Sequence, residues 1–381
     1  MRRLIYFNPE NDAALASGMA NFTAPRAAVG LRTAGESLAL WYGHPGDRFV
    51  STGINGNWYR TVTEAFGITV DVYNGNPEGL VPAPWGWSAA VRRTFLEMGL
   101  QSDVLPDDSR LNSIRALSNR ATALTLTARL RSQGLDVAGS GTVATDIATA
   151  LSAVAAYGRA MIKQPWSSSG RGVFDTGLMQ SKEVGRLCLG TIRRYGSVIV
   201  EPFRDEAIDC ALLFEMADGT ARYTGLSVFE TDSHNTYVGS TVAADHKLDT
   251  GVRARFGTGR PYPITDTMTS AVADALTDII GTAYSGPLGI DLLLTPHGDS
   301  PAAIAEINLR NTMGHLCHCF AKRFLGAGLK AHFSVERNTP RPDSCPLALA
   351  TVAQGRLTAG TMQLNPPSCS IAFVMHVDRN D

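Results

Sequence analysis

The chain has 381 residues, of which 44% are apolar and 18% are charged. These values exclude a disordered tail and a fibrous protein, and the length suits about two or three domains. Lysine and arginine number 34 and aspartate and glutamate number 35, so the net charge is −1. This balance argues against a protein that binds nucleic acid or an anionic membrane over a broad surface, because such proteins carry a surplus of positive charge.

The N-terminus predicts a buried strand rather than a targeting segment. Too few apolar residues follow Arg2 and Arg3 for a signal peptide, and no stretch of the chain approaches the roughly 20 apolar residues of a membrane helix. We therefore expect a cytoplasmic protein. The six cysteines are scattered along a long chain, which favours reduced thiols.

The first 114 residues predict an α/β domain with a mostly parallel sheet. Short apolar runs that indicate strands alternate with helical spacing. A segment rich in proline and glycine, residues 75–87, predicts a loop or crossover. The expected strands are residues 3–7, 48–51 and 68–72, and the expected helices are 27–40, 88–98 and 109–134, the last of which crosses the boundary at 114.

The pattern changes after residue 140. Residues 231–262 show no clean period, and from residue 332 onward short β-like runs are separated by proline-rich turns. We expect helices at residues 144–157, 181–195 and 265–283, and strands at 159–163, 197–200, 209–215, 221–229, 289–294 and 302–308.

Residues 289–310 form the most informative segment, a hairpin with two acids. Its two apolar strands flank a turn rich in proline, glycine and aspartate. A turn centred between Gly298 and Asp299 places Asp291 opposite Glu306, and Asn308 leaves the same face of its strand as Glu306. Two carboxylates about 5 Å apart on an apolar hairpin repel each other, and a hard cation such as Mg²⁺, with Mn²⁺ as an alternative, would remove that conflict.

Two other interpretations of the hairpin stay open from the residues alone. It can be an ordinary surface hairpin whose acids point to solvent, or Arg310 can neutralise one carboxylate as a structural ion pair.

A second group of residues suits a nucleotide. Lys163 ends an apolar strand and is followed by a polar loop with glycines, whose backbone N–H groups can approach phosphate oxygens; the alternative is a plain flexible connection. Glu201 and Phe203 end a further apolar strand, where an adenine can pack, and Asp209 can reach a ribose hydroxyl. Alternatively, Glu201 simply ends a strand in solvent. The loop residues in question are Ser168, Ser169, Gly170, Arg171 and Gly172.

The order of these elements resembles the ATP-grasp superfamily over residues 115–330. The resemblance is carried by Lys163 with SSSGRGV, by IVEPF, by GPLGIDLLL and by IAEINLR. It implies an N-terminal α/β domain followed by a two-lobed ATP-grasp domain, with lobes at residues 115–200 and 201–331 and a β-rich extension at 332–381. It also implies ATP held between the lobes, with a metal bridging its phosphates.

The resemblance also implies a role for each matching residue. Lys163 would contact the α- and β-phosphates under the 168–172 loop, Glu201 and Phe203 would flank the adenine, and Asp209 would meet the ribose. Asp291, Glu306 and Asn308 would hold one or two Mg²⁺ ions, and Arg310 would neutralise the transferring phosphoryl group or the acylphosphate.

The chain departs from the family pattern at several places. Arg120 stands where a first phosphate-contacting lysine is usual, and Asp209 or Glu206 must replace the usual glutamate at the ribose. No central catalytic cation stands out. The candidates in the region without a clean period are Lys247, Arg253, Arg255 and Arg260.

Two further segments invite a functional interpretation. Asn8, Glu10, Asn11 and Asp12 follow the first strand, where open sheets bind ligands; they can bind a polar substrate or form a solvated turn that caps a helix. His315, Cys317, His318 and Cys319 have metal-ligand chemistry, but no second ligand pair accompanies them, which favours a structural role.

From these features we expect an ATP- and Mg²⁺-dependent ligase. It would activate a small-molecule carboxylate as an acylphosphate and couple it to an amine or a similar nucleophile, releasing ADP and phosphate. The alternatives are a nucleotide-binding regulatory or assembly protein without turnover, and a phosphotransferase of the same fold. The sequence names neither substrate, and it does not indicate an oligomeric state.

Overall fold

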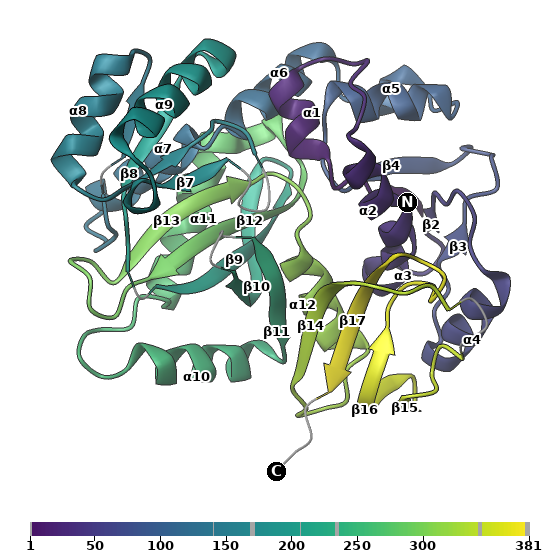
Figure 1. The fold of residues 1–381 in the computed structure, drawn as a ribbon. Coiled ribbons are helices and arrows are strands. Elements are labelled where there is room, and N and C mark those ends of the chain that lie inside the picture. Colours follow the sequence, from purple (N-terminus) through teal and green to yellow (C-terminus); the bar gives the residue numbers. More distant parts are fainter. Residues whose placement is uncertain are drawn as a thin grey trace.

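The structure is a computed structural model that describes residues 2–139, 141–167, 172–205, 207–232, 236–341 and 345–377. Three sheets organise these residues (Figure 1). None of the described helices is long and apolar enough to cross a membrane. All six cysteines are free thiols.

The N-terminal sheet is parallel, with strand order β3-β2-β1-β4, as the sequence predicts. Its core gathers large aromatic side chains, including those of Trp41, Phe49 and Trp58. Its strands are β1 (Arg2–Tyr6), β2 (Arg48–Phe49), β3 (Asp71–Val72) and β4 (Leu80–Pro84), and the helices of this region are α1 (Asn11–Ser17), α2 (Arg26–Gly35), α3 (Ala39–Tyr42), α4 (Gly56–Phe66) and α5 (Ala89–Glu97).

Strand β4 corrects one prediction, because residues 75–87 are not only a loop. β4 pairs with β1 in the register Leu4↔Pro82 and Tyr6↔Pro84, and it forms one edge of its sheet. An edge strand needs N–H donors on one side only, so prolines at alternate positions remove no ladder bond. The prolines of this segment are therefore compatible with a strand at the edge of the sheet, and they do not indicate a loop.

A second sheet, antiparallel, has the order β5-β8-β6-β7. Helices α8 and α9 pack against it through small and branched side chains, among them Ala150, Val184 and Val198. Its elements are β5 (Thr142–Ala144), α8 (Ile147–Tyr157), β6 (Ala160–Lys163), β7 (Val173–Asp175), α9 (Ser181–Tyr195) and β8 (Val198–Pro202).

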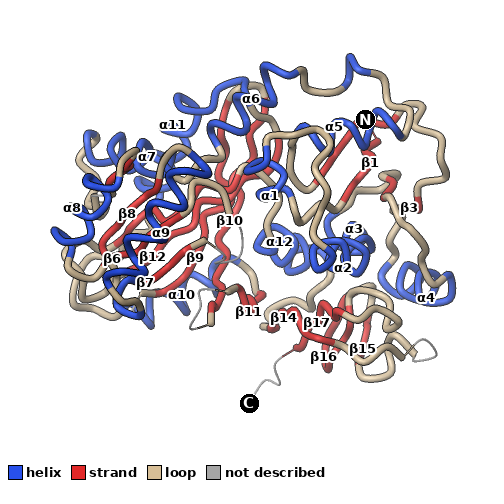
Figure 2. Tube along the Cα trace, turned by 45° about the horizontal axis from the view of Figure 1, so that its top comes forward, coloured by secondary structure: helices blue, strands red, loops and turns tan. Residues whose placement is uncertain are grey.

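The third sheet has nine strands in the order β13-β12-β9-β10-β11-β14-β17-β16-β15 (Figure 2). Every neighbouring pair in it is antiparallel. The strands are β9 (Ile208–Ala217), β10 (Thr220–Thr231), β11 (Tyr237–Val242), β12 (Gly286–Leu294), β13 (Ala302–Asn308), β14 (Ala331–Arg337), β15 (Ala350–Ala353), β16 (Arg356–Gln363) and β17 (Ile371–Val377).

Helices cover this large sheet. α7 and α11 share its main core with β9, β12 and β13, and α12 packs against β10, β11 and α3. The remaining helices are α6 (Asp108–Leu117), α7 (Ala121–Ser132), α10 (Asp245–Phe256), α11 (Asp266–Ile280) and α12 (Met313–Arg323), with 3₁₀ turns η1 (Glu36–Leu38), η2 (Ser102–Val104), η3 (Thr176–Leu178) and η4 (Gly281–Ala283).

Two features of the large sheet were not apparent in the sequence. The region without a clean period contains β11 and α10, and β14 pairs with β11, so the C-terminal strands continue the same sheet. The domain ranges given above remain a prediction. What matters for the site is that β6 and β8 of the second sheet face β9, β12 and β13 of the large one across a shared cavity.

Candidate active site

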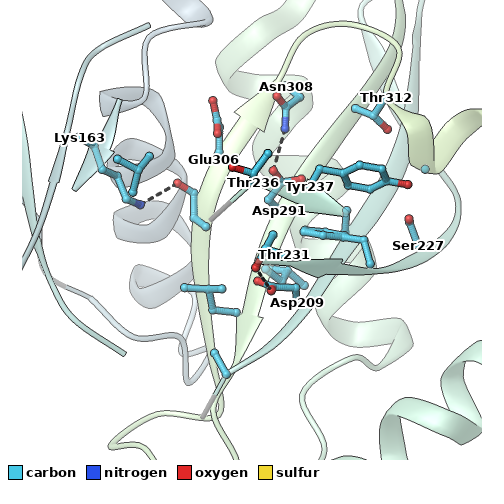
Figure 3. Close-up of a pocket in the computed structure, with 18 of the residues that line it drawn as sticks. Lys163, Asp209, Ser227, Thr231, Thr236, Tyr237, Asp291, Glu306, Asn308 and Thr312 are labelled. Atoms are coloured by element: carbon cyan, nitrogen blue, oxygen red, sulfur yellow. Dashed lines mark hydrogen bonds between the residues drawn. The ribbon is translucent and has the colours of Figure 1, made fainter. Parts of the chain in front are cut away.

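A cavity of about 840 Å³ lies between the second sheet and the large sheet (Figure 3). This volume is at the upper end of ordinary ligand pockets. Most of the described residues that the sequence assigned to nucleotide, metal or phosphoryl binding line it, namely Arg120, Lys163, Glu201, Phe203, Asp209, Asp291, Glu306, Asn308 and Arg310.

The polar loop after Lys163 is described only at its ends. Ser168, Ser169, Gly170 and Arg171 lie outside the described residues, as does Glu206. Gly172 is described, and its carbonyl accepts a hydrogen bond from the Gln164 N–H at 2.7 Å, which closes the base of the loop. Gly172 does not itself line the cavity.

The register of the acidic hairpin is confirmed. Asp291 of β12 pairs with Glu306 of β13, and Gly289 pairs with Asn308. Asp291, Glu306 and Asn308 all line the cavity, and Figure 3 shows Asn308 directed toward Asp291. The interpretation of a surface hairpin with its acids in solvent is therefore wrong.

A bulge interrupts this register on the turn side of the acids. Leu292 pairs with Ile304, so Ala305 is an extra residue in β13. A bulge leaves a residue unpaired in the ladder, and here the Ala305 carbonyl accepts a hydrogen bond from Lys163 Nζ at 3.3 Å. Because β13 is an edge strand of the large sheet, this carbonyl is available to link the two sheets.

Asp291 is the most strongly perturbed acid of the site. Its pKa is raised to about 7, mainly by burial and next by the nearby Glu306 carboxylate, while Arg310 lowers it. Asn308 Nδ2 donates to Asp291 Oδ2 at 3.0 Å. A buried carboxylate next to a second one lacks a compensating positive charge, and perturbation of this kind is typical of functional sites.

The donor set at this position fits a hard divalent cation. Asp291 and Glu306 supply carboxylate oxygens, and Asn308 keeps its amide oxygen available because its nitrogen makes the bond to Asp291. Oxygen donors of this kind suit Mg²⁺, which completes its coordination with water or substrate oxygens. Among the described residues, no group of three or more His, Cys, Asp or Glu side chains converges on one point.

Two ion pairs join the walls of the cavity. Arg120, 3% exposed, donates to Glu306 Oε2 at 3.0 Å and to the carbonyls of Gln164 and Ser167 at 3.1 and 3.2 Å. Lys163 Nζ donates to Glu201 Oε2 at 2.7 Å. Both cations are buried and already hydrogen-bonded, so they are held in fixed positions at the cavity wall.

Phe203 and Asp209 are also held in place where they line the cavity. The Arg159 guanidinium lies 3.5 Å above the Phe203 ring, a cation–π contact that fixes the ring. Thr231 Oγ1 donates to Asp209 Oδ2 at 3.0 Å, and burial raises the pKa of Asp209.

Arg310 is paired with the N-terminal region rather than with the hairpin acids. Its Nη2 lies 2.8 Å from Asp12 Oδ2. Asn8 bonds the backbone of Gly86 at 2.8 Å, and Glu10 pairs with Arg32. Three side chains of the polar segment after β1 thus make internal contacts, and among them Asp12 is the partner of Arg310.

The cation expected between residues 231 and 262 is not found at the site. Lys247, Arg253, Arg255 and Arg260 do not line the cavity; Arg253, for example, pairs with Asp249 at 2.6 Å on the outside of α10. Instead Arg204, directly after Phe203, lines the cavity, and burial lowers its pKa. The sequence shows that Arg204 follows the IVEPF segment, but no sequence pattern indicated that its side chain lines the cavity.

The histidines and cysteines after the hairpin have structural contacts. His315 and Thr312 form a capping box at the start of α12, with Thr312 Oγ1 2.9 Å from His315 Nδ1. His318 Nδ1 lies 3.1 Å from Asp245, and Cys317 is buried in the apolar core.

The far end of the cavity contains residues that the sequence did not single out. They come from α2, β10, β11, the start of α12, β14 and β17, and they include Leu31, Ser227, Phe229, Tyr237, Thr312, Met313, Gly314, Val335, Glu336, Arg337, Ile371 and Phe373. Only pairing and packing bring these distant segments together, so no local pattern could have predicted them.

Comparison with known proteins supports the fold through structure alone. No protein-family model and no curated protein matches the sequence. The biotin carboxylase–β,γ-ATP complex of Campylobacter jejuni is similar with a TM-score of 0.54, at 10% identity over 98% of this chain and 87% of that chain. N5-carboxyaminoimidazole synthetase from Staphylococcus aureus gives 0.49 at 10% identity over 100% and 95% of the two chains. L-amino acid ligase from Bacillus licheniformis gives 0.45 at 14% identity over 84% and 90%.

Of these three TM-scores, the first is high enough to support an assignment of the fold. At 10% sequence identity it shows the fold alone. The similarity covers nearly the whole chain, including the N-terminal parallel sheet and the large antiparallel sheet. The fold predicted from the four sequence motifs is therefore confirmed.

Proposed function

We propose that this chain, which has the ATP-grasp fold, is an ATP- and Mg²⁺-dependent ligase that joins a carboxylic acid to an amine through an acylphosphate. The observation that carries the proposal is the meeting of Asp291, Glu306 and Asn308 with Lys163 and Arg120 around one cavity. Oxygen ligands for a cation and fixed cations for phosphates are the components that phosphoryl transfer needs.

The residues divide into three roles. Lys163 and Arg120 would bind phosphate oxygens from the side of the second sheet, Phe203 would pack against the adenine, and Asp209 would accept from a ribose hydroxyl. Asp291, Glu306 and Asn308 would hold Mg²⁺, which supplies charge neutralisation for the phosphates when bound. Support for a nucleotide in this cavity also comes from the biotin carboxylase of similar fold, which forms a complex with β,γ-ATP.

Arg310 would act at the reacting groups. A carboxylate oxygen of the acid attacks the γ-phosphorus, the bond from that phosphorus to the β,γ-bridging oxygen breaks, and ADP leaves. The amine nitrogen then attacks the acyl carbon, phosphate leaves, and the nitrogen loses a proton. Asp12 orients the Arg310 guanidinium toward the cavity, where its charge would offset the negative charge that gathers on the phosphoryl oxygens.

A hydroxylamine assay tests the proposal. The protein is incubated with Mg²⁺, ATP and a panel of small carboxylic acids, with hydroxylamine as a general nucleophile, and both ADP and acyl hydroxamate are measured. We expect equal amounts of the two products with at least one acid. Glu306→Gln should lower the rate about 100-fold or more, whereas Glu97→Gln, which removes an exposed ion pair with Arg93 on α5, should leave it unchanged.

Two outcomes would overturn the proposal in favour of the alternatives. ATP binding without ADP release on any acid would indicate a nucleotide-binding protein without turnover. ADP release with a stable phosphorylated product, and no hydroxamate, would indicate a phosphotransferase.

A further inference from the structure

The far end of the cavity has a polar wall and an apolar wall. Figure 3 places Ser227, Tyr237 and Thr312 on the side away from Lys163. All of them line the same cavity as the nucleotide and metal candidates, so a small molecule at this end would lie beside Arg310 and Asn308.

The polar wall is made by the start of α12 and by Ser227. The backbone N–H groups of Met313 and Gly314, in the first turn of this helix, make no hydrogen bond to any described residue. Such N–H groups carry the positive end of the helix dipole and favour an anion.

Ser227 gives an independent indication of a ligand at this wall. Its side chain is 4% exposed and lines the cavity, yet its hydroxyl has no hydrogen-bond partner among the described residues. The Ser227 Oγ lies 2.7 Å from the point that a Cβ on Gly314 would occupy, so it faces the same helix turn. Because this hydroxyl faces the cavity, a bound group can supply the hydrogen bond that no described residue supplies.

The second wall at this end of the cavity is apolar. Phe229 and Tyr237 lie with ring centroids 6.3 Å apart, and Val335 pairs with Phe373 in the register of β14 and β17. Met313, Leu31 and Ile371 complete this wall. Glu336 and Arg337, which also line this end, are exposed at its rim.

We infer that the acid substrate is a small carboxylic acid with an aromatic or branched aliphatic side chain; this inference rests on the proposed function. Its carboxylate would accept from Ser227 Oγ and from the N–H groups of Met313 and Gly314, next to Arg310. Its side chain would pack against Phe229, Tyr237 and Phe373. A second charge or a row of hydroxyls on the substrate would lose hydration against this wall with no described buried partner to replace it.

Binding measurements test the inference without relying on turnover. Calorimetry of the full chain with Mg²⁺ and a non-hydrolysable ATP analogue would compare 3-phenylpropanoate and 4-methylpentanoate with glutarate and gluconate. We expect the two apolar acids to bind at least about tenfold more tightly than the two polar acids. Tighter binding of glutarate or gluconate would overturn the inference.

Variants test separately the polar wall and the apolar wall in binding of the acid. Ser227→Ala should weaken binding of the apolar acids about tenfold, because it removes a hydrogen bond to a charged group. Ser37→Ala is the matched control, since Ser37 is also buried with an unpartnered hydroxyl but does not line the cavity. Phe229→Ala should reduce the preference for 3-phenylpropanoate over glutarate. Equal effects of Ser227→Ala and Ser37→Ala would contradict the polar wall.

The inference and the proposed function can fail separately. Hydroxamate formation with glutarate or gluconate only would leave the ligase in place and overturn the apolar substrate. Selective binding of the apolar acids without ADP release would support the binding site and overturn the ligase.

Discussion

Asp12 and Arg310 lie 298 residues apart in the sequence and form a largely buried ion pair with an Nη2–Oδ2 distance of 2.8 Å. The aspartate belongs to the first helix after β1, and the arginine follows the strand that carries Glu306 and Asn308. The pair therefore fixes the orientation of a cavity arginine from a remote part of the chain, which makes the N-terminal region part of the site.

Asp12→Asn should reduce turnover more than it reduces stability. Arg310 would lose the charge that orients it, and we expect kcat for ADP release to fall about 10- to 100-fold, with binding of the ATP analogue changed little. Asp47→Asn is the control, because Asp47 forms a similar pair with Arg3 at 2.6 Å, but that arginine does not line the cavity. If both variants slow turnover equally, the orienting role of Asp12 is wrong.

The pH dependence of stability should report on Asp291. Its pKa is raised from 3.8 to about 7 in the folded protein, so between these values the folded protein keeps a proton that the unfolded chain releases. The contribution of Asp291 to the free energy of unfolding therefore falls as pH rises from about 4 to 7. Asp291→Asn should remove this slope in thermal melts of the metal-free protein.

Mg²⁺ should stabilise the folded protein more strongly as the pH rises, which is opposite to the effect of the proton on Asp291. It binds the carboxylate and competes with the proton, so the increase in Tm on adding Mg²⁺ should be larger at pH 8 than at pH 6. The Asp291→Asn variant should show little increase at either pH. A Tm increase that is independent of pH would argue against Asp291 as a ligand.

The contribution of Lys163 to the stability of the fold can be measured separately from its contribution to ATP binding. Lys163→Met leaves Glu201 buried without its partner and should destabilise the fold by roughly 3 kcal/mol, while weakening ATP binding. Adding Glu201→Gln should recover most of the stability but not the ATP affinity. Recovery of both in the double variant would show that Lys163 is only structural; denaturant unfolding and calorimetry measure the two quantities.

Two glycines of α2 offer a test of the fold itself. A Cβ on Gly35 would lie 2.2 Å from Cε1 of Phe7, whereas a Cβ on Gly30 would meet nothing within 4 Å. Gly30→Ala should stabilise the protein by roughly 0.5–1 kcal/mol through helix propensity, and Gly35→Ala should destabilise it by about 1–3 kcal/mol through overpacking. Equal effects in denaturant unfolding would mean that α2 does not pack on Phe7 as described.

Local chemistry explains why part of the site was predictable. The turn around Gly298 is short and its residue types are specific, so the pairing of Asp291 with Glu306 followed from the sequence. The bulge at Ala305 did not follow from it, because no residue type in the hairpin sequence marks an extra residue in β13. In the same way, prolines at 82 and 84 indicated a loop until the edge position of β4 was known.

By itself, then, the sequence determined several local features: the acidic hairpin, the strands that carry Lys163 and Glu201, and the alternating N-terminal unit. Tertiary structure alone decided which side chains face one another across the cavity, including the partner of Arg310 and the apolar end near Tyr237. The physical reason is the distance along the chain over which each kind of interaction acts. Turn preference and periodicity act over a few residues, whereas ion pairs and cavity walls depend on the packing of whole sheets, which no short stretch of chain encodes.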